Sequence, residues 1–453
     1  MRPSPLKSNP WLGIHLVSDT YAPGDTITGY VYRKTPISTP DALVSCCLHG
    51  GASVDSNHDL GMISSFTLLT CHGESNILYR GPLRIQDNNS ERWSFSLKVP
   101  IYADSTTNAS NTFTSFTQVG ATDHQLPPTY ALYSADVIGI FVEYFVSVKL
   151  IFDVHERTQM LDARHPFKLV QYSPHPPIAD FALGVWRYPR SMRGTHLIPG
   201  IQRERASLFG WTKRSLSRTD GPIFTYDLLF GFPTRIQLDN PTPIPLRLVV
   251  FPKWEETTDI IQNVPQKCTL LSIKVLLVTR TKIMTRRGRE KYYTNTVDLG
   301  VPKAMSRLQN EILIPCVSSW DPVDIGEMIN LRIGLQETGF PYASKKEEFT
   351  PSFRTYNMTV THRIQCAIKV KVAGESFSVK GEANVLLLRS SDEREQSSRG
   401  QDASTMDEDL DTELGIFEAE EDDSWIRPPP EDDAPPSFAD IIVMGRDTNA
   451  QER

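Results

Sequence analysis

The chain has 453 residues, more than one domain of ordinary size needs, so its length predicts two or three folded units. Lysine and arginine number 47 against 54 aspartates and glutamates, a net charge of -7 that hides a strong asymmetry. Residues 390–453 hold 20 acidic and 5 basic residues, a net charge of -15, whereas residues 1–389 hold 42 basic and 34 acidic residues, a net charge of +8. The composition therefore indicates a mildly basic body followed by a strongly acidic tail.

Membrane-spanning, secreted and disulfide-scaffold classes do not fit this sequence. Its longest apolar run, residues 137–152, is interrupted by Glu143 and Lys149 and is shorter than the roughly 20 apolar residues that a spanning helix needs. Residues 1–7 are polar and lack the apolar centre of a secretory signal. Six cysteines without C-x-x-C spacing predict reduced thiols, and we expect a cytoplasmic protein.

Period-two alternation of apolar and polar residues is the main pattern of the first half of the body. Odd positions are apolar in residues 92–99, and even positions are apolar in residues 138–152. Alternate side chains of a strand point to opposite faces, so both segments predict half-buried strands. Shorter strands are expected at residues 12–16 and 27–32.

The second half of the body repeats this pattern. Apolar residues stand at positions 360, 364, 366, 368, 370 and 372 and at positions 377, 379, 383, 385 and 387, with a turn expected at residues 373–376. Shorter strands are expected at residues 246–251 and 273–279. No helical stripe of about 12 residues or more is present.

Together these patterns predict an all-β protein with two immunoglobulin-like antiparallel β-sandwich domains. Pro, Gly and Arg without alternation predict a linker between them, and a tail rich in Ser, Asp, Glu and Pro is expected to be disordered. The predicted parts are a flexible N-terminus at 1–10, a first domain at 11–172, a linker at 173–222, a second domain at 223–389 and a disordered acidic tail at 390–453.

A short motif joins the first strands and includes Tyr21, Gly24, Asp25 and Gly29. Pro23 and Gly24 predict a tight turn in which Gly24 takes a positive φ, while Gly29 lets the next strand bend or approach a neighbour closely. The segment resembles the Y-x-x-G-D-x-(hydrophobic)-x-G-x-V opening hairpin of arrestin-like proteins.

Three further segments follow in the order found in that family. They are residues 125–130 before the long strand, residues 240–246 at the start of a strand, and the strand pair at 358–388. With the hairpin they cover most of residues 11–388, and the chain resembles an α-arrestin, an arrestin-domain-containing trafficking adaptor. The resemblance implies that the two sandwiches have the arrestin fold.

The tail contains a proline motif, Pro435, Pro436, Ser437 and Phe438, that resembles the P-P-x-Y sequence of α-arrestins. In that family the motif binds WW domains of HECT-type ubiquitin ligases, because paired prolines favour the extended helix that docks in an aromatic groove. Phe438 stands where the family has Tyr, and the missing hydroxyl is expected to weaken binding by about 0.5–1.5 kcal/mol.

A literal P-P-x-Y also occurs at residues 127–130, directly before the long strand. We interpret it as a folded turn between strands with Tyr130 packed inward, and an exposed WW ligand is the alternative.

A basic cluster lies near the turn between two expected strands of the second half, and arginine suits such a cluster to pairing with anions. The arrestin resemblance implies a surface that binds acidic or phosphorylated cargo. Alternatively, the cluster is an ordinary solvated hairpin tip. A third interpretation is that the acidic tail folds back onto the basic body and competes with cargo. A second cluster at residues 203–218 is interpreted as a solvated linker. The first cluster, which lies near the turn, comprises Arg280, Lys282, Arg286, Arg287, Arg289 and Lys291.

Catalytic and metal-binding patterns are lacking, so we expect no enzyme activity, metal or cofactor. Adjacent Cys46 and Cys47 point to opposite faces of a strand, which favours core cysteines over metal ligands. His362 lies on the apolar side of its strand and is interpreted as a core histidine with a hydrogen-bond partner. The other residues that could form a metal-binding cluster with Cys46 and Cys47 are His49, His58, Cys71 and His72.

The resemblance implies a non-enzymatic adaptor that binds cytosolic tails of membrane transporters or receptors and recruits a WW-domain HECT ubiquitin ligase. Such a protein would be recruited peripherally to the plasma membrane and endosomes. Anionic lipid headgroups would be a further partner, and nucleic acid would not be bound. One alternative is an arrestin-fold sorting or signalling scaffold that recruits no ligase. Another is a β-sandwich hydrolase or lectin-like enzyme, which would need a concave site with perturbed carboxylates.

Overall fold

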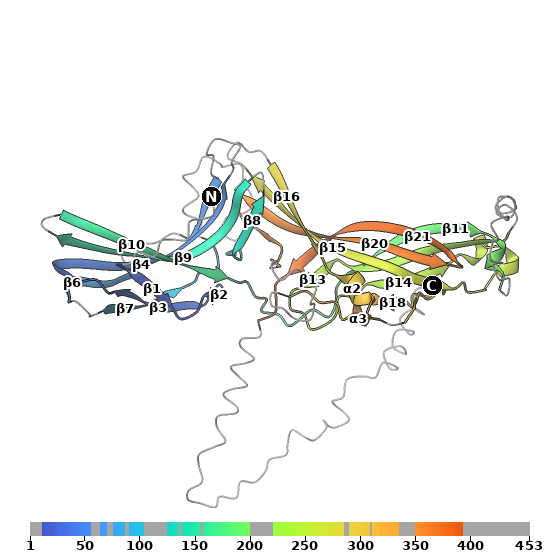
Figure 1. Ribbon diagram of the computed structural model, residues 1–453, viewed down its shortest axis with the longest axis horizontal. Helices are drawn as coiled ribbons and strands as arrows, with labels where there is room; N and C mark the ends of the chain where they lie inside the picture. Colours follow the sequence, from blue (N-terminus) through green and yellow to red (C-terminus); the bar gives the residue numbers. More distant parts are fainter. Residues whose placement is uncertain are drawn as a thin grey trace, which may run out of the picture. The chain divides into compact units, whose positions relative to one another are not determined.

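The protein is described by a computed structural model in which strands and connecting loops account for nearly all of the structure (Figure 1). Residues Met1–Asp392 form one compact unit. The described part contains two short α-helices, α2 (Val301–Met305) and α3 (Ile325–Met328), and three 3-10 helices, η2 (Thr195–Leu197), η4 (Trp254–Glu256) and η5 (Asp259–Ile261). No helix of this part is long and apolar enough to cross a membrane. The all-β prediction is confirmed. The described residues are 11–55, 64–69, 76–86, 90–103, 125–134, 137–154, 157–199, 221–284, 290–308, 310–334 and 349–392.

The N-terminal sandwich packs a three-stranded sheet, in the order β1-β3-β7, against a larger sheet in the order β2-β10-β9-β4-β5. Strand β6 pairs with β4, and β8 pairs with β9. All pairs are antiparallel except the short pair of β2 with β10. The strands are β1 (Gly13–Leu16), β2 (Thr20–Tyr21), β3 (Thr26–Arg33), β4 (Ile37–Asp55), β5 (Ser64–Leu69), β6 (Ile77–Ile85), β7 (Glu91–Lys98), β8 (Tyr130–Ser134), β9 (Val137–Val154) and β10 (Arg157–Leu169).

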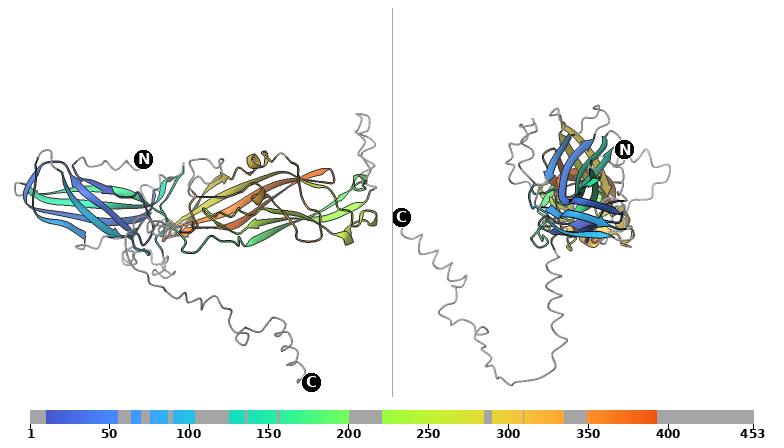
Figure 2. Two further views of the ribbon diagram at one scale, coloured as in Figure 1. Left: turned by 90° about the horizontal axis from the view of Figure 1, so that it is seen from below. Right: turned by 90° about the vertical axis from the view of Figure 1, so that its left-hand side faces the viewer.

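The C-terminal sandwich has the same plan, with sheets in the orders β11-β12-β14-β18 and β13-β21-β20-β15-β16. Strand β17 pairs with β15 and β19 with β20, and the short pair of β13 with β21 is parallel. In Figure 2 the orange and yellow strands of the larger sheet run side by side. The strands are β11 (Leu183–Arg193), β12 (Ile223–Pro233), β13 (Arg235–Gln237), β14 (Arg247–Pro252), β15 (Cys268–Met284), β16 (Glu290–Asp298), β17 (Ile312–Leu313), β18 (Val323–Asp324), β19 (Phe353–Arg354), β20 (Met358–Val372) and β21 (Glu375–Leu388).

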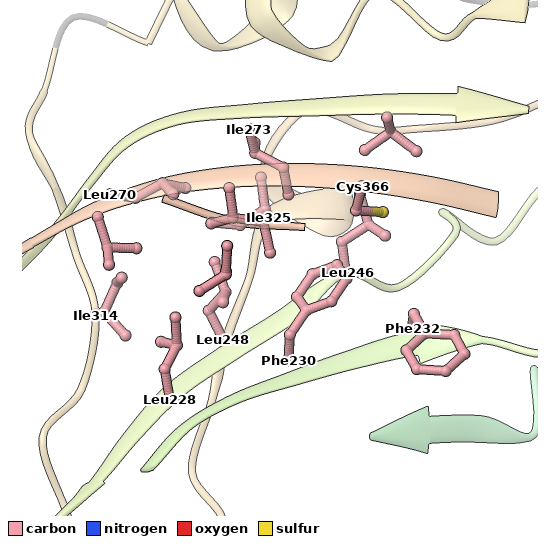
Figure 3. Close-up of a cluster of buried hydrophobic side chains, with 14 of the residues drawn as sticks. Leu228, Phe230, Phe232, Leu246, Leu248, Leu270, Ile273, Ile314, Ile325 and Cys366 are labelled. Atoms are coloured by element: carbon pink, nitrogen blue, oxygen red, sulfur yellow. The ribbon is translucent and has the colours of Figure 1, made fainter. Parts of the chain in front are cut away.

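Alternation decides which side chains enter each core. Along β9 the even positions from Ile140 to Phe152 are buried, as the sequence pattern predicts. In the C-terminal sandwich Phe230 of β12 and Leu248 of β14 face Ile273 of β15 across the space between the two sheets (Figure 3). Burial of one such side chain contributes about 1.5–3 kcal/mol, so both sandwiches have substantial cores.

One strand lies inside the range predicted to be a linker. Strand β11 pairs antiparallel with β12 along its full length, although residues 173–222 show no alternation. It is the edge strand of its sheet, a position that tolerates Pro189 because a proline there breaks no internal ladder. The second sandwich therefore begins with β11, before the boundary expected at residue 223.

The cysteines depart in one respect from the expected reduced thiols. Cys47 is disulfide-bonded, and its partner is not among the described residues. The expectation is therefore wrong for Cys47 and confirmed for the buried free thiols of Cys46, Cys268, Cys316 and Cys366. His49 of the candidate cluster bonds through its ring to the Ser147 hydroxyl at 2.7 Å and stacks on Phe145. His58, Cys71 and His72 lie outside the described residues.

Two strands of the C-terminal sandwich also enter the N-terminal core. Ile283 of β15 and Met358 and Val360 of β20 are buried among the side chains of the N-terminal sandwich. Next to them the hydroxyls of Tyr130 and Thr281 share a hydrogen bond of 2.7 Å. The two sandwiches are thus joined by shared apolar packing and by a buried polar contact.

Removing the Tyr130 hydroxyl tests this junction. In Tyr130→Phe the Thr281 hydroxyl, which is 1 % exposed, loses its partner, and we expect the free energy of unfolding to fall by about 1–3 kcal/mol in urea titrations. The same change at Tyr102, which is 50 % exposed, should cost less than about 0.5 kcal/mol. Equal effects at the two positions would show that the buried bond does not contribute.

Candidate functional site

The β15–β16 hairpin carries the basic cluster found in the sequence. The register places Lys282 of β15 directly opposite Tyr292 of β16. Arg286, Arg287 and Arg289 fall within residues 285–289, which lie outside the described part of the chain. The geometry of the cluster is therefore defined by its members on the two strands.

Arg280 and Lys282 project from the solvent side of the hairpin, where both have partners. The Arg280 guanidinium lies 3.9 Å from the centre of the Tyr292 ring, and the Lys282 ammonium forms an ion pair with Glu290. The hydrogen bond from Lys282, with another from the Tyr292 hydroxyl, lowers the pKa of the Glu290 carboxyl. Glu290 is then ionised at neutral pH and offsets one of the two positive charges, while the Arg280 guanidinium packs against an aromatic face.

Lys291 does not share this surface. It is paired with Ile283, whose side chain is buried in the N-terminal core, and successive residues of a strand point to opposite sides. Lys291 therefore projects to the side opposite Arg280 and Lys282. The sequence cluster combined residues of both faces, and the register of β15 with β16 separates them.

The same solvent-facing side carries further lysines that the sequence analysis did not assign to a site. Lys369 and Lys371 lie on the polar parity of β20, which the alternation of residues 360–372 already reveals. Lys274 and Lys380 become their neighbours only through the pairing of β15 and β21 with β20, a register that the sequence does not display.

The hairpin motif at residues 21–29 forms a closed turn. Gly24 has a φ of 94°, and the Asp25 carboxylate accepts a hydrogen bond from the Ala22 N–H at 2.8 Å. A side chain at Gly29 would drive its Cβ into the His15 carbonyl oxygen, well inside van der Waals contact. Tyr21 is buried against Phe167 of β10. The motif residues thus hold the first strands together through turn geometry and packing.

The literal P-P-x-Y at residues 127–130 is part of the folded core, as predicted. Pro127 and Pro128 are buried, and the Pro127 carbonyl accepts a hydrogen bond of 2.7 Å from the Tyr144 hydroxyl. Thr129 is bonded to Leu169 through both backbone and side chain. Burial raises the pKa of the Tyr130 hydroxyl, in keeping with its inward position. The other proline motif, Pro435 to Phe438, lies outside the described residues.

His362 is a core histidine, as predicted. It is 2 % exposed, and its Nδ1 lies 3.0 Å from the Ser352 hydroxyl, which also accepts a hydrogen bond from the Leu387 N–H. Burial lowers its pKa to about 4. A nearby surface pocket is lined by Thr129, Lys168 and Phe349, among others, and its lining contains no carboxylate.

Substitution of Gly29 tests the structural role of the hairpin motif. In Gly29→Ala the added methyl group meets a backbone carbonyl that cannot rotate away, so β1 and β3 must separate, and we expect a loss of about 3 kcal/mol in the free energy of unfolding. Gly51→Ala is the matched control in β4, because its Cβ would meet only an ordinary contact at 3.6 Å. A neutral Gly29→Ala in urea unfolding would contradict this account.

The buried His362 predicts a pH-dependent stability. The unfolded histidine takes up a proton near pH 6.5 and the folded one near pH 4, so folding stability is present above pH 6.5 and falls as the pH drops between these values. At pH 5 this residue should lower the free energy of unfolding by about 2 kcal/mol relative to pH 8. His362→Gln should flatten the profile by that amount, and the same change at exposed His175 should leave it unaltered.

The residues brought together on the solvent side of β15, β16, β20 and β21 can bind anions, and no buried nucleophile or metal is needed for that chemistry. The hairpin motif and the first proline motif belong to the framework that carries this surface. In comparisons with known proteins, no family model and no curated protein matches the chain.

Proposed function

We propose that the chain is a non-enzymatic trafficking adaptor of the α-arrestin kind, a cytosolic protein recruited to the plasma membrane and endosomes. In this proposal two sandwiches of the arrestin fold bind cytosolic tails of membrane transporters or receptors. A disordered acidic tail brings a WW-domain HECT ubiquitin ligase to the cargo, which promotes its ubiquitination and endocytosis. The observation that carries the proposal is the plan shared by the two sandwiches, in which a short strand runs parallel to a long outer strand of the larger sheet.

Cargo would be held by the basic hairpin. Arg280 lies on the solvent side of β15, six residues before Arg286 in the sequence, and Arg287 and Arg289 follow. Guanidinium groups pair bidentately with carboxylates and phosphates, which suits acidic or phosphorylated cytosolic tails. Modest affinity at each site suffices, because two attachments to one complex raise the effective concentration of each partner.

A scaffold that sorts cargo without a ligase is the second candidate. The observation that favours it is Phe438, which replaces the tyrosine of the WW-binding motif. The lectin-like or hydrolase alternative would require carboxylates in a concave site. We therefore retain ligase recruitment as the proposed function and the scaffold as its competitor.

Proline substitutions in the tail test ligase recruitment. The full chain should be captured by immobilised WW domains of HECT ligases, and Pro435→Ala with Pro436→Ala should abolish capture because the preformed extended helix is lost. Pro428→Ala with Pro429→Ala removes two prolines from the same tail and is the matched control, which should bind as the unaltered chain does.

The residue at position 438 separates the two candidates. Phe438→Tyr should strengthen WW binding roughly 2- to 10-fold, which corresponds to one recovered hydrogen bond of about 0.5–1.5 kcal/mol. Capture that appears only in Phe438→Tyr would favour the scaffold, and capture that persists without Pro435 and Pro436 would remove this motif from the proposed function.

A further inference from the structure

The outer side of the three-stranded N-terminal sheet, labelled β1, β3 and β7 in Figure 1, carries aromatic and basic side chains from all three strands. His15 of β1 is paired with Tyr30 of β3. Tyr32 of β3 is paired with Arg92 of β7. Val31, which lies between the two tyrosines, is buried in the N-terminal core, so the tyrosines and the residues paired with them point to solvent.

These side chains contact one another along the sheet surface. The ring centres of His15 and Tyr30 lie 4.7 Å apart, and those of Tyr30 and Tyr32 lie 6.1 Å apart. The Arg92 guanidinium lies 5.0 Å from the centre of the Tyr30 ring. The Lys34 ammonium lies 5.6 Å from the centre of the Tyr32 ring. Each tyrosine therefore has a cation beside its ring, and we call His15, Tyr30, Tyr32, Lys34 and Arg92 the aromatic face.

The aromatic face offers positive charge and hydrogen-bond donors without a carboxylate. None of the residues on the outer side of β1, β3 and β7 is acidic. Within the described part of the chain, Lys34 and Arg92 form no ion pair. The hydroxyls of Tyr30 and Tyr32 likewise have no hydrogen-bond partner among the described residues. A ligand that complements this face must supply acceptors and negative charge.

The position of the face in the sheet also limits the kind of ligand. Tyr30 and Tyr32 lie on β3, the middle strand, which pairs with β1 on one side and β7 on the other. A peptide over these rings cannot add to β3 as a further strand, so it must bind through side chains and its own carbonyl groups. A polyproline helix suits such an open surface, because its carbonyls have no internal partners and its stiffness lowers the entropic cost of binding.

We propose that the aromatic face binds a proline-rich peptide of a partner protein, in which acidic residues accompany the prolines. The proline rings would pack against the aromatic rings, and the hydroxyls of Tyr30 and Tyr32 would donate hydrogen bonds to the peptide carbonyls. Carboxylates of the peptide would pair with Arg92 and Lys34. This interaction requires neither cargo nor ligase, so it goes beyond the proposed function and is tested separately.

Single-stranded nucleic acid also binds to rings and cations, but the contacts within the face favour a peptide. Bases bind by stacking on an uncovered ring face. Arg92 lies over the Tyr30 ring and the His15 ring packs beside it, so a base would have to displace these contacts. A carboxylate can instead accept hydrogen bonds from the N–H groups of Arg92 while the guanidinium stays in place.

The tail of this chain also combines prolines and acidic residues, at residues 428–433. The motif from Pro435 to Phe438 follows almost directly and is the segment that the proposed function assigns to WW domains. A WW domain needs room on both sides of the helix that it binds, so a docked segment at 428–433 would obstruct it. We therefore assign the aromatic face to a partner protein.

Fluorescence anisotropy with the full-length chain tests the proposal. The probe is a labelled synthetic peptide of consecutive Pro-Pro-Glu repeats. One control peptide has Ala in place of every Pro and keeps the charge, and the other has Gln in place of every Glu and keeps the prolines. Both controls should bind on the order of tenfold more weakly than the probe, because the first must pay to order its backbone and the second loses the ion pairs.

Two double variants separate the contributions of the face. Tyr30→Phe with Tyr32→Phe keeps the rings and removes both hydroxyls, and it should weaken binding of the probe on the order of tenfold. Lys34→Gln with Arg92→Gln should weaken binding of the probe by a similar factor while binding of the uncharged peptide changes less than about twofold.

The matched control removes the same charge from the other sheet of this sandwich. Lys149 and Arg157 are exposed on β9 and β10, and their joint substitution by Gln should leave binding of the probe within about twofold of the unaltered chain, since the attraction falls off within a Debye length. Urea midpoints of all variants verify that the chain is folded.

Four results would overturn the proposal. Equal affinity for the three peptides would show that neither prolines nor acidic residues are recognised, and unchanged binding of the probe in both face variants would place its site elsewhere. Binding of labelled oligouridylate instead of the peptides, lost in Lys34→Gln with Arg92→Gln, would identify a nucleic-acid surface. A several-fold gain in affinity in Pro428→Ala with Pro429→Ala would identify the tail as the occupant. WW capture depends on other residues, so failure here leaves the proposed function untouched.

Discussion

The pairing of β15 with β20 holds the described part of the protein together, because each strand contributes side chains to both hydrophobic cores. Ile273 and Ile368 lie in the C-terminal core, whereas Ile283 and Met358 lie in the N-terminal core. The register of this pair is therefore set from both ends, and a slip by one residue would turn apolar side chains to solvent in two places. The same register fixes where Arg280 and the lysines of β20 emerge.

The two sandwiches reach one plan through different residues. In the first, the turn after β2 uses Gly24 with a positive φ and the Asp25 carboxylate as an acceptor for a backbone N–H. In the second, Asp239 takes the positive φ after β13, and Asn240 accepts from the Thr242 N–H at 2.8 Å. The shared requirement is a sharp change of direction after a short strand that runs parallel to a longer one.

Alternation predicted the strands that are buried on one face, and it failed where that pattern is broken. Residues 138–152 and 360–372 were found because one parity is apolar throughout, apart from His362 in the second segment. Strand β4 has 19 residues, but only Cys46 and Cys47 were assigned to a strand in advance, since Pro40 and the Gly50–Gly51 pair interrupt the alternation. The Tyr130–Thr281 bond joins residues 151 positions apart, and no local pattern reports such a contact. Face assignments within the basic cluster likewise required the register.

The participation of β15 and β20 in the N-terminal core has a consequence for synthesis. A ribosome completes the N-terminal strands through β10 long before it has made Met358 and Val360. Until those residues emerge, the apolar surface around Tyr130 stays exposed to solvent, and the partly folded nascent chain is prone to aggregate. The final closure of the first sandwich is therefore a late, long-range event, and the emerging N-terminal sandwich is a natural client for chaperones that shield apolar surface.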